Sequence, residues 1–202
     1  METTSPEEPR PAATVIAARD AGDGVEVLVV KRSSESRFLP GYVVFPGGAV
    51  DPGDADFAVR WFGDADEATR ACAIRELAEE TGLALTSNGL EPRGAGHVDT
   101  APPPEALRQI SHWVAPEEVP VRFDARFFAV SVSNGVQPIA DGTEAEHAWW
   151  ADPRALLREY EAGTTSLYWP TFKMMEALAS CSTVEEVLAL DVPQDDGDEE
   201  DE

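Results

Sequence analysis

The chain contains 202 residues, and 43% of them are hydrophobic, which is enough for one domain with one substantial core. Its formal net charge of −24 argues against a nucleic acid or an anionic membrane surface as a partner. The two cysteines, Cys72 and Cys181, are too few for a disulfide framework. Neither a membrane-spanning apolar run nor a secretory signal is evident in the sequence. We therefore expect a cytoplasmic protein.

Three segments are predicted along the chain. Residues 1–11 are expected to be a flexible leader, 12–190 one folded domain, and 191–202 an acidic, disordered tail. Two runs rich in β-branched residues, 12–19 and 25–32, flank a turn of Asp, Ala and Gly. The domain is therefore expected to begin with a β-hairpin.

A short third strand is predicted over residues 42–45, directly before Pro46-Gly47-Gly48. Glycines at 47 and 48 let backbone amides and carbonyls approach a ligand or a metal ion closely. A strand, a glycine loop and then an acidic helix is an order in which a site for phosphate and metal can be assembled.

Residues 75–83, Arg-Glu-Leu-Ala-Glu-Glu-Thr-Gly-Leu, carry the most information about function. Positions three and four apart share a face of a helix, so Glu76, Glu79 and Glu80 are expected to converge. Three neighbouring carboxylates repel one another unless something neutralises them. A hard divalent cation held by oxygen ligands is the natural partner of such a cluster.

The helix that carries these glutamates has recognisable ends. Asp64, followed three residues later by Glu67, resembles a capping box, and Gly82 is placed to end the helix. Before the helix, residues 51–54 (Asp-Pro-Gly-Asp) have strong turn chemistry, and residues 57–63 form a short, partly aromatic segment. We therefore predict an excursion from the glycine loop that returns at Asp64.

The second half of the chain predicts alternating strands and helices. Strands are expected over 125–132 and 145–150, and helices over 105–110, 153–161, 170–180 and 183–188. Together with the hairpin, this pattern predicts an α/β fold of the α+β type, with a mixed sheet flanked by helices.

The glycine loop and residues 75–83 together resemble the Nudix box, whose core is Arg-Glu-apolar-x-Glu-Glu-x-Gly-apolar with an upstream glycine and glutamate. Glu67 takes the place of that first glutamate, with seven residues between it and Arg75. The usual box has five residues between its glycine and this glutamate, whereas here residues 49–66 would form a long insertion. The resemblance implies a Nudix-like α/β/α sandwich and a hydrolase that cleaves a pyrophosphate with Mg²⁺ or Mn²⁺.

The resemblance also implies which groups bind the metal. Glu79 and Glu80 would be the main ligands, and Glu76 would be either a further ligand or the proton acceptor. The carbonyl oxygen of Gly47 or Gly48 would be an additional ligand.

Further residues would support these ligands. Arg75 would orient the glutamates, and Glu67 would be its salt-bridge partner. A last acid often comes from a segment beyond the helix, and here Glu144 and Glu146 are the candidates, with Glu144 preferred. The alternative is that both are ordinary loop acids.

The segment before the glycine loop indicates a branch of the family. Arg32-Ser33, Arg37 and Gly41 are spaced as in the upstream element of coenzyme A diphosphatases, and Trp113-Val114-Ala115-Pro116 and the insertion resemble the peroxisomal members. This implies substrate contacts from Arg32, Arg37, Gly47 and Gly48. The two arginines suit the phosphates of coenzyme A because a guanidinium binds phosphates bidentately. The alternative is that both arginines merely border a strand and face solvent.

Coenzyme A or acyl-coenzyme A is thus the expected substrate, and a small nucleotide the expected partner. Two alternatives remain open: a hydrolase of ADP-ribose, NADH or a diadenosine polyphosphate, and a Nudix-fold regulator that binds nucleotides without cleaving them. Loss of the box glutamates would indicate the second alternative, and this chain retains them. Dimers are frequent in this superfamily, so a homodimer also stays open.

Overall fold

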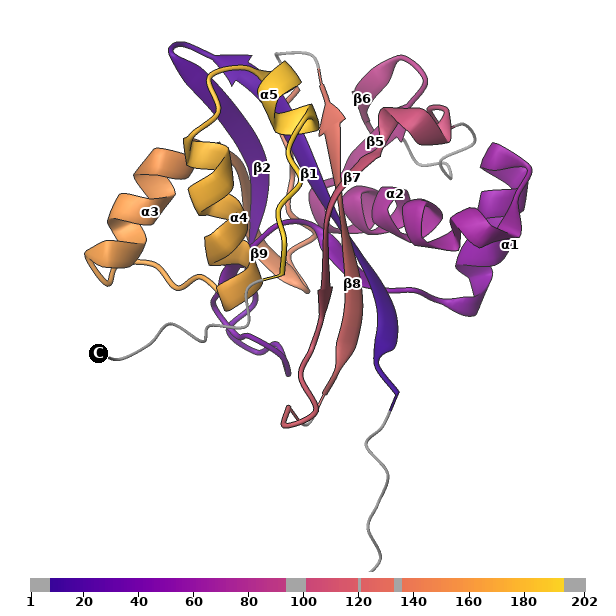
Figure 1. Ribbon diagram of the computed structural model, residues 1–202, viewed down its shortest axis with the longest axis horizontal. Helices are drawn as coiled ribbons and strands as arrows, with labels where there is room; N and C mark the ends of the chain where they lie inside the picture. The colour runs from indigo at the N-terminus through magenta and orange to yellow at the C-terminus, as the bar shows by residue number, and fades with distance from the viewer. Residues whose placement is uncertain (1–7, 94–100, 120, 133–135, 195–202) are drawn as a thin grey trace, which may run out of the picture.

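A mixed β-sheet forms the centre of the molecule (Figure 1). The computed structural model describes residues 8–93, 101–119, 121–132 and 136–194. The strands of the main sheet are β1 (Arg10–Ala21), β2 (Gly24–Arg32), β3 (Val43–Val44), β4 (Gly47–Ala49), β7 (Arg108–Val114), β8 (Phe123–Ser131) and β9 (Ala145–Ala151). They are ordered β3-β2-β1-β8-β7, with β4 pairing to β1 and β9 to β2. β1 and β8 run parallel, and the other pairs are antiparallel.

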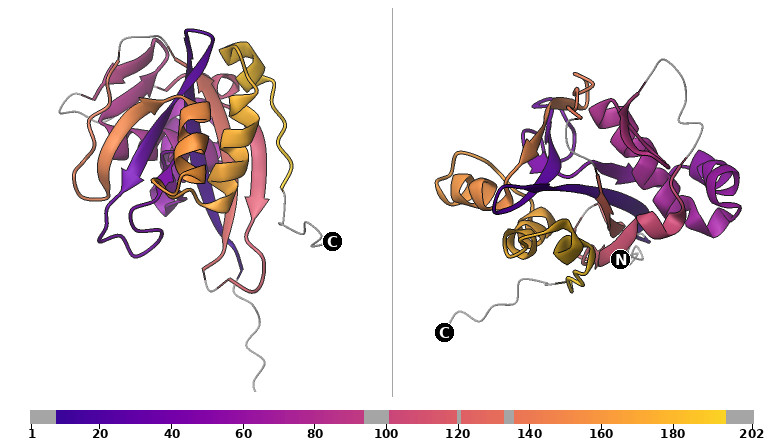
Figure 2. Two further views of the ribbon diagram at one scale, coloured as in Figure 1. Left: turned by 90° about the vertical axis from the view of Figure 1, so that its left-hand side faces the viewer. Right: turned by 90° about the horizontal axis from the view of Figure 1, so that it is seen from above.

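Helices cover both faces of this sheet (Figures 1 and 2). The helical elements are α1 (Pro52–Phe62), η1 (Ala65–Glu67), α2 (Ala68–Thr81), η2 (Pro104–Ala106), α3 (Pro153–Glu161), α4 (Trp169–Ala179) and α5 (Val184–Leu188). Helices α1 and α2 lie on one side, and α3, α4 and α5 lie on the other. β5 (Leu83–Thr86) and β6 (Gly89–Pro92) form a separate hairpin. Within the described residues, none of the helices is long and apolar enough to cross a membrane.

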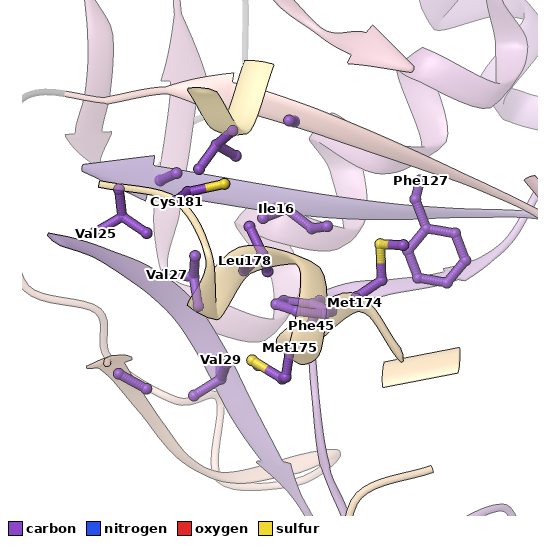
Figure 3. Close-up of a cluster of buried hydrophobic side chains, with 14 of the residues drawn as sticks. Ile16, Val25, Val27, Val29, Phe45, Phe127, Met174, Met175, Leu178 and Cys181 are labelled. Carbon is purple, nitrogen blue, oxygen red and sulfur yellow. The ribbon is translucent and has the colours of Figure 1, made fainter. Parts of the chain in front are cut away.

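The sequence of β1 explains why both faces are covered. Ile16 and Ala18 belong to the buried cluster under α3, α4 and α5, part of which is drawn in Figure 3. Val15 and Ala17 belong to the cluster under α2. Successive side chains of a strand point to opposite faces, so an uninterrupted apolar run can be buried on both. The α/β/α sandwich confirms the predicted fold class.

One predicted helix is wrong. Residues 105–110 were expected to be helical, but only η2 is a helical turn, and β7 begins at Arg108. The register of β7 against β8 buries Ile110 and Trp113, and this tertiary pairing overrides the local helical pattern. The predicted hairpin is confirmed, since Ala21 pairs with Gly24.

The predicted ends of the domain also need correction. β1 begins at Arg10, so the last residues of the expected leader belong to the sheet. Residues 191–194 of the expected tail contact β7, and Val192 forms a parallel bridge with Ser111. The remainder of both segments, 1–7 and 195–202, lies outside the described residues.

The excursion after the glycine loop is an α-helix rather than a turn. Asp51 is the N-cap of α1, Pro52 occupies the first turn, and Gly63 ends the helix with φ of 77°. Asp-Pro is typical of both a turn and a helix start, which is why the two cannot be separated from sequence. Phe57 and Trp61, one turn apart, stack with ring centroids 5.0 Å apart.

Candidate active site

Helix α2 presents its glutamates at different depths. Its apolar face, with Ile74 and Leu77, is buried against the sheet. Glu80 is 4% exposed, whereas the Glu79 side chain is 49% exposed and Glu76 lies between these extremes. A buried carboxylate such as that of Glu80 requires a partner. Gly82 ends the helix in a left-handed conformation with φ of 65°, as predicted.

The glycine loop is fitted against these carboxylates. The amide of Gly47 donates a 3.1 Å hydrogen bond to Glu80 Oε2. A Cβ atom at Gly48 would overlap the Glu76 carboxylate, and one at Gly47 would overlap the carbonyl of Ala13 on β1. Only glycine therefore allows β4 to pair with β1 while the carboxylates of α2 approach the loop.

Arg75 connects the loop side of the site to the helix. Its Nε and Nη2 donate to the two oxygens of Asp54 at 2.8 and 3.0 Å. Its Nη1 donates to Glu76 at 2.8 Å and to Glu79 at 3.0 Å. Asp54 is fully buried and also accepts a 2.8 Å bond from the amide of Asp51. The bidentate pair fixes the guanidinium, which in turn holds two of the glutamates.

The predicted partner of Arg75 is therefore wrong: Glu67 pairs with Arg70 instead. Glu67 immediately precedes α2, and Arg75 lies eight positions further along, about 12 Å away along the helix axis. Asp54 performs the role expected of Glu67.

A signal for Asp54 was present in the sequence. Five residues, 49–53, separate it from Gly48, which is the usual spacing of the box. An aspartate thus stands where a glutamate was sought. Counted from Asp54, an insertion would lie between Asp54 and Arg75, over residues 55–74, instead of over the expected 49–66.

Burial and mutual repulsion raise the pKa values of two carboxyl groups, those of Glu80 and Glu76. The pKa of Glu80 is raised to about 8, chiefly by burial and then by the charge of Glu76, against the opposing effects of the Gly47 amide and Arg32. The pKa of Glu76 is also raised, first by burial, while Arg75 lowers it and Glu79 and Glu144 raise it. The site holds more negative charge than its own arginines neutralise, so a cation would be favoured there.

The structure distinguishes the two candidates for the last acid. Glu144 lines the same cavity as Glu76 and Glu80. Glu146 accepts a 2.9 Å hydrogen bond from the amide of Ser34 and is not among the residues that line the cavity.

The two arginines also differ. Arg32 lines the cavity, lies 3.9 Å from Glu80 Oε1 and donates a 3.0 Å bond from Nε to the carbonyl of Phe38. Arg37 is exposed and is not among the lining residues. The fold thus brings Arg32 to the acids, while Arg37 stays outside.

The donors suit a hard divalent cation. They are carboxylates and, at Gly47 and Gly48, backbone carbonyls, with no soft sulfur or imidazole ligand in the predicted set. Among the described residues, no group of three or more acidic, histidine or cysteine side chains is already arranged as a metal site. The assignment of Glu76, Glu79, Glu80, Glu144 and Gly47 as ligands therefore stays a prediction.

The cavity extends well beyond the acids, with a volume of about 510 Å³. Its far side is apolar and is contributed by β7, β8, the segment between them and the segments around Phe38 and Tyr168. The Phe38 ring meets Phe123 and Tyr168 edge-on, with centroids 5.8 and 6.0 Å away. Most of this wall was missed from sequence, because its members are distant in the chain and form no motif.

Comparisons with known proteins agree with this geometry. The family model of the NUDIX domain matches residues 8–168. The crystal structure of a NUDIX hydrolase from Alicyclobacillus acidocaldarius is 33% identical with a TM-score of 0.80, covering 92% of this chain and 98% of that one.

Two curated proteins match over shorter parts of their length. "Putative nudix hydrolase 7" of Caenorhabditis elegans is 28% identical over 161 residues, which are 70% of this chain and 51% of that protein. The acyl-coenzyme A diphosphatase NUDT19 of Gallus gallus is 29% identical over 128 residues, 44% of this chain and 33% of that protein. The chain thus spans about half or less of these relatives. By its matched domain and its site, it belongs to the Nudix family.

Proposed function

We propose that this chain is a metal-dependent pyrophosphohydrolase, with coenzyme A or acyl-coenzyme A as the favoured substrate. The observation that carries the proposal is one cavity that joins an acidic end, with Glu76, Glu80 and Glu144, to an extended apolar end. The acidic end suits a cation-bound diphosphate, and the apolar end suits a substrate with a long, weakly polar group beyond the diphosphate.

Each group of the acidic end has a proposed role. Glu79, Glu80 and Glu144, with the carbonyl of Gly47, would hold Mg²⁺ or Mn²⁺, and Glu76 would be either a further ligand or the acceptor of the water's proton. When bound, the cation would neutralise charge on the diphosphate oxygens during hydrolysis.

Residues of the chain would also position substrate and ligands. Arg32 would bind a phosphate, and Arg75, fixed by Asp54, would keep Glu76 and Glu79 oriented. Water would attack one phosphorus, breaking its bond to the bridging oxygen, and Glu76 is the candidate to accept the water's proton. Burial of Glu76, which raises its pKa, favours such a proton-accepting role.

The coenzyme A assignment is also supported by the similarity to the chicken acyl-coenzyme A diphosphatase. ADP-ribose, NADH and diadenosine polyphosphates remain the alternative substrates. A binding-only role is disfavoured because Arg75, Glu76, Glu79 and Glu80 are all retained.

The proposal can be tested by product analysis. Purified protein is incubated with coenzyme A, acyl-coenzyme A, ADP-ribose, NADH and a diadenosine polyphosphate, with Mg²⁺, with Mn²⁺ and with neither, and products are identified by mass spectrometry. We expect metal-dependent release of 3′,5′-ADP and the phosphopantetheine product. Cleavage of another dinucleotide alone would keep the hydrolase activity but contradict the coenzyme A assignment. Binding without cleavage of any compound would contradict the proposed activity.

A further inference from the structure

The last described residues, 191–194, run along the edge of the sheet; we refer to them as the strap. The amide of Val192 donates a 2.8 Å bond to the carbonyl of Ile110, and Ser111 Oγ donates a 2.6 Å bond to the carbonyl of Val192. Because β7 ends the strand order, its outer edge would otherwise leave backbone groups unpaired. The strap thus occupies the free edge of β7.

The strap reaches the cavity first through Ser111. The indole Nε1 of Trp113 donates a 2.9 Å bond to Ser111 Oγ, the same hydroxyl that donates to Val192. Trp113 is 7% exposed and lines the apolar end of the cavity. One buried hydroxyl therefore connects the strap to the position of a cavity-lining ring.

A second connection is made by Gln194. Its side-chain Oε1 accepts a 2.8 Å bond from the amide of Val114, and its Nε2 donates a 3.1 Å bond to the carbonyl of Val114. The side-chain amide thus pairs with the strand as another backbone amide would. Both Gln194 and Val114 line the cavity.

A bulge in β7 allows both connections. Gln109 pairs with Phe128 and Ser111 with Phe127, so Ile110 is the extra residue. As a result, Ile110 and Ser111 are both buried although they are consecutive. Bulges re-aim side chains in this way. Here the bulge places the Ser111 hydroxyl between the strap and Trp113.

We propose that the strap shapes the apolar end of the cavity, with Ser111 and Gln194 as positioning residues that set affinity for the apolar group beyond the diphosphate. This inference rests on the proposed function, because it takes the substrate to be a nucleoside diphosphate joined to such a group. The acidic end, formed by α2 and the glycine loop, does not depend on the strap.

The test compares binding of two ligands that differ at the apolar end. Octanoyl-coenzyme A carries a long apolar group, and ADP carries only nucleoside and diphosphate. Calorimetric titration with Ca²⁺ in place of Mg²⁺, another hard divalent cation that takes oxygen ligands, gives Kd for each. The variants are Gln194→Ala, Ser111→Ala and a chain ending at Asp191. The controls are Gln109→Ala, an exposed glutamine on the same strand, and a chain ending at Gln194.

We expect Gln194→Ala and Ser111→Ala to weaken octanoyl-coenzyme A binding about tenfold, and the chain ending at Asp191 at least as much, because it loses the contacts of both Val192 and Gln194. ADP binding should change by less than about twofold. The controls should match the wild type, and Ser111→Thr, which keeps a hydroxyl, should restore part of the affinity. Gln194→Ala changes an exposed side chain, so folding is retained in at least one variant.

Two results would overturn the inference: equal changes for both ligands, or no change in any of the three variants. It would also fail if the wild-type protein bound octanoyl-coenzyme A no more tightly than ADP. Binding is measured separately from turnover, so a failure to hydrolyse either compound would contradict the proposed function alone.

Discussion

The two ends of the cavity are built in opposite ways. The acidic end draws mainly on one helix and one adjoining loop, with Glu144 added from the segment before β9. Its residues on the helix, Glu76, Glu79 and Glu80, are set by helical spacing. The apolar end is assembled from segments far apart in the chain, including Phe38, Trp113 and the strap. The difference indicates that the chemistry is fixed locally, whereas substrate choice depends on tertiary packing. Variants at the two ends should therefore have separable effects.

The largest effect is expected at the acidic end, from Glu79→Gln. Loss of a metal-binding charge should lower kcat by at least about 100-fold. The side chain is half exposed, so the melting temperature should change little. Glu185→Gln on α5, another exposed glutamate, is the control for activity and stability. Full activity of Glu79→Gln at saturating Mg²⁺ would remove Glu79 from the metal site.

A second comparison separates Asp54 from Glu67. Asp54→Asn leaves the Arg75 guanidinium without its buried partner, and should cost about 3 kcal/mol of unfolding free energy and reduce activity. Glu67→Gln removes only a partly exposed pair with Arg70 and should cost less than about 1 kcal/mol. Denaturant unfolding monitored by circular dichroism measures both. A larger effect of Glu67→Gln would reinstate the original assignment.

The junction of the two ends is tested at Arg32. Arg32→Ala removes a guanidinium that lines the cavity beside Glu80, so KM should rise about tenfold. Arg37→Ala is the matched control, since Arg37 is exposed and outside the cavity, and its KM should stay within about twofold. Steady-state kinetics with the best substrate gives the KM of both variants and of the wild type. Equal changes in KM for the two variants would contradict the proposal that Arg32, and not Arg37, binds a phosphate of the substrate.

The fourth comparison concerns the pH dependence of stability in the metal-free protein. The pKa of Glu80 is about 8 in the folded state, mainly because of burial, against about 4.3 for an ordinary glutamate. Between these values the folded chain keeps a proton that the unfolded chain has released. Stability should therefore fall as pH rises from about 4 to about 8, by up to about 1.4 kcal/mol per pH unit from this group.

Glu80→Gln should remove this part of the slope. Urea unfolding of both proteins at several pH values from 5 to 8 provides the comparison. Parallel stability curves for wild type and variant would show that Glu80 titrates normally in the fold.

Local patterns predicted the acidic end well. The end of α2 at Gly82, the hairpin of β1 and β2 and the glycine loop all follow from short-range rules. The predicted start of the helix is wrong, because Asp64 caps the short helical turn η1 and not α2. Residue type alone selects Glu67 as the partner of Arg75, whereas the spacing from Gly48 and the buried carboxylate identify Asp54.

The apolar end could not be predicted in the same way. Residues 105–110, which include the start of β7, are predicted to be helical from local sequence, whereas the pairing of β7 with β8 makes residues 108–114 a strand. Residues 191–194 border an acidic run that predicts a disordered tail, yet Gln194 lies at the cavity. Long-range pairing of this kind leaves no periodic signal in a single sequence.

The central claim is that the carboxylates of α2 and Glu144 bind the catalytic cation. Crystals grown with Mn²⁺ and coenzyme A, measured at the manganese absorption edge, test it most directly. The account predicts anomalous peaks among Glu76, Glu79, Glu80 and Glu144, at the acidic end of the cavity. A well-ordered substrate without manganese there, or manganese bound only elsewhere, would contradict it.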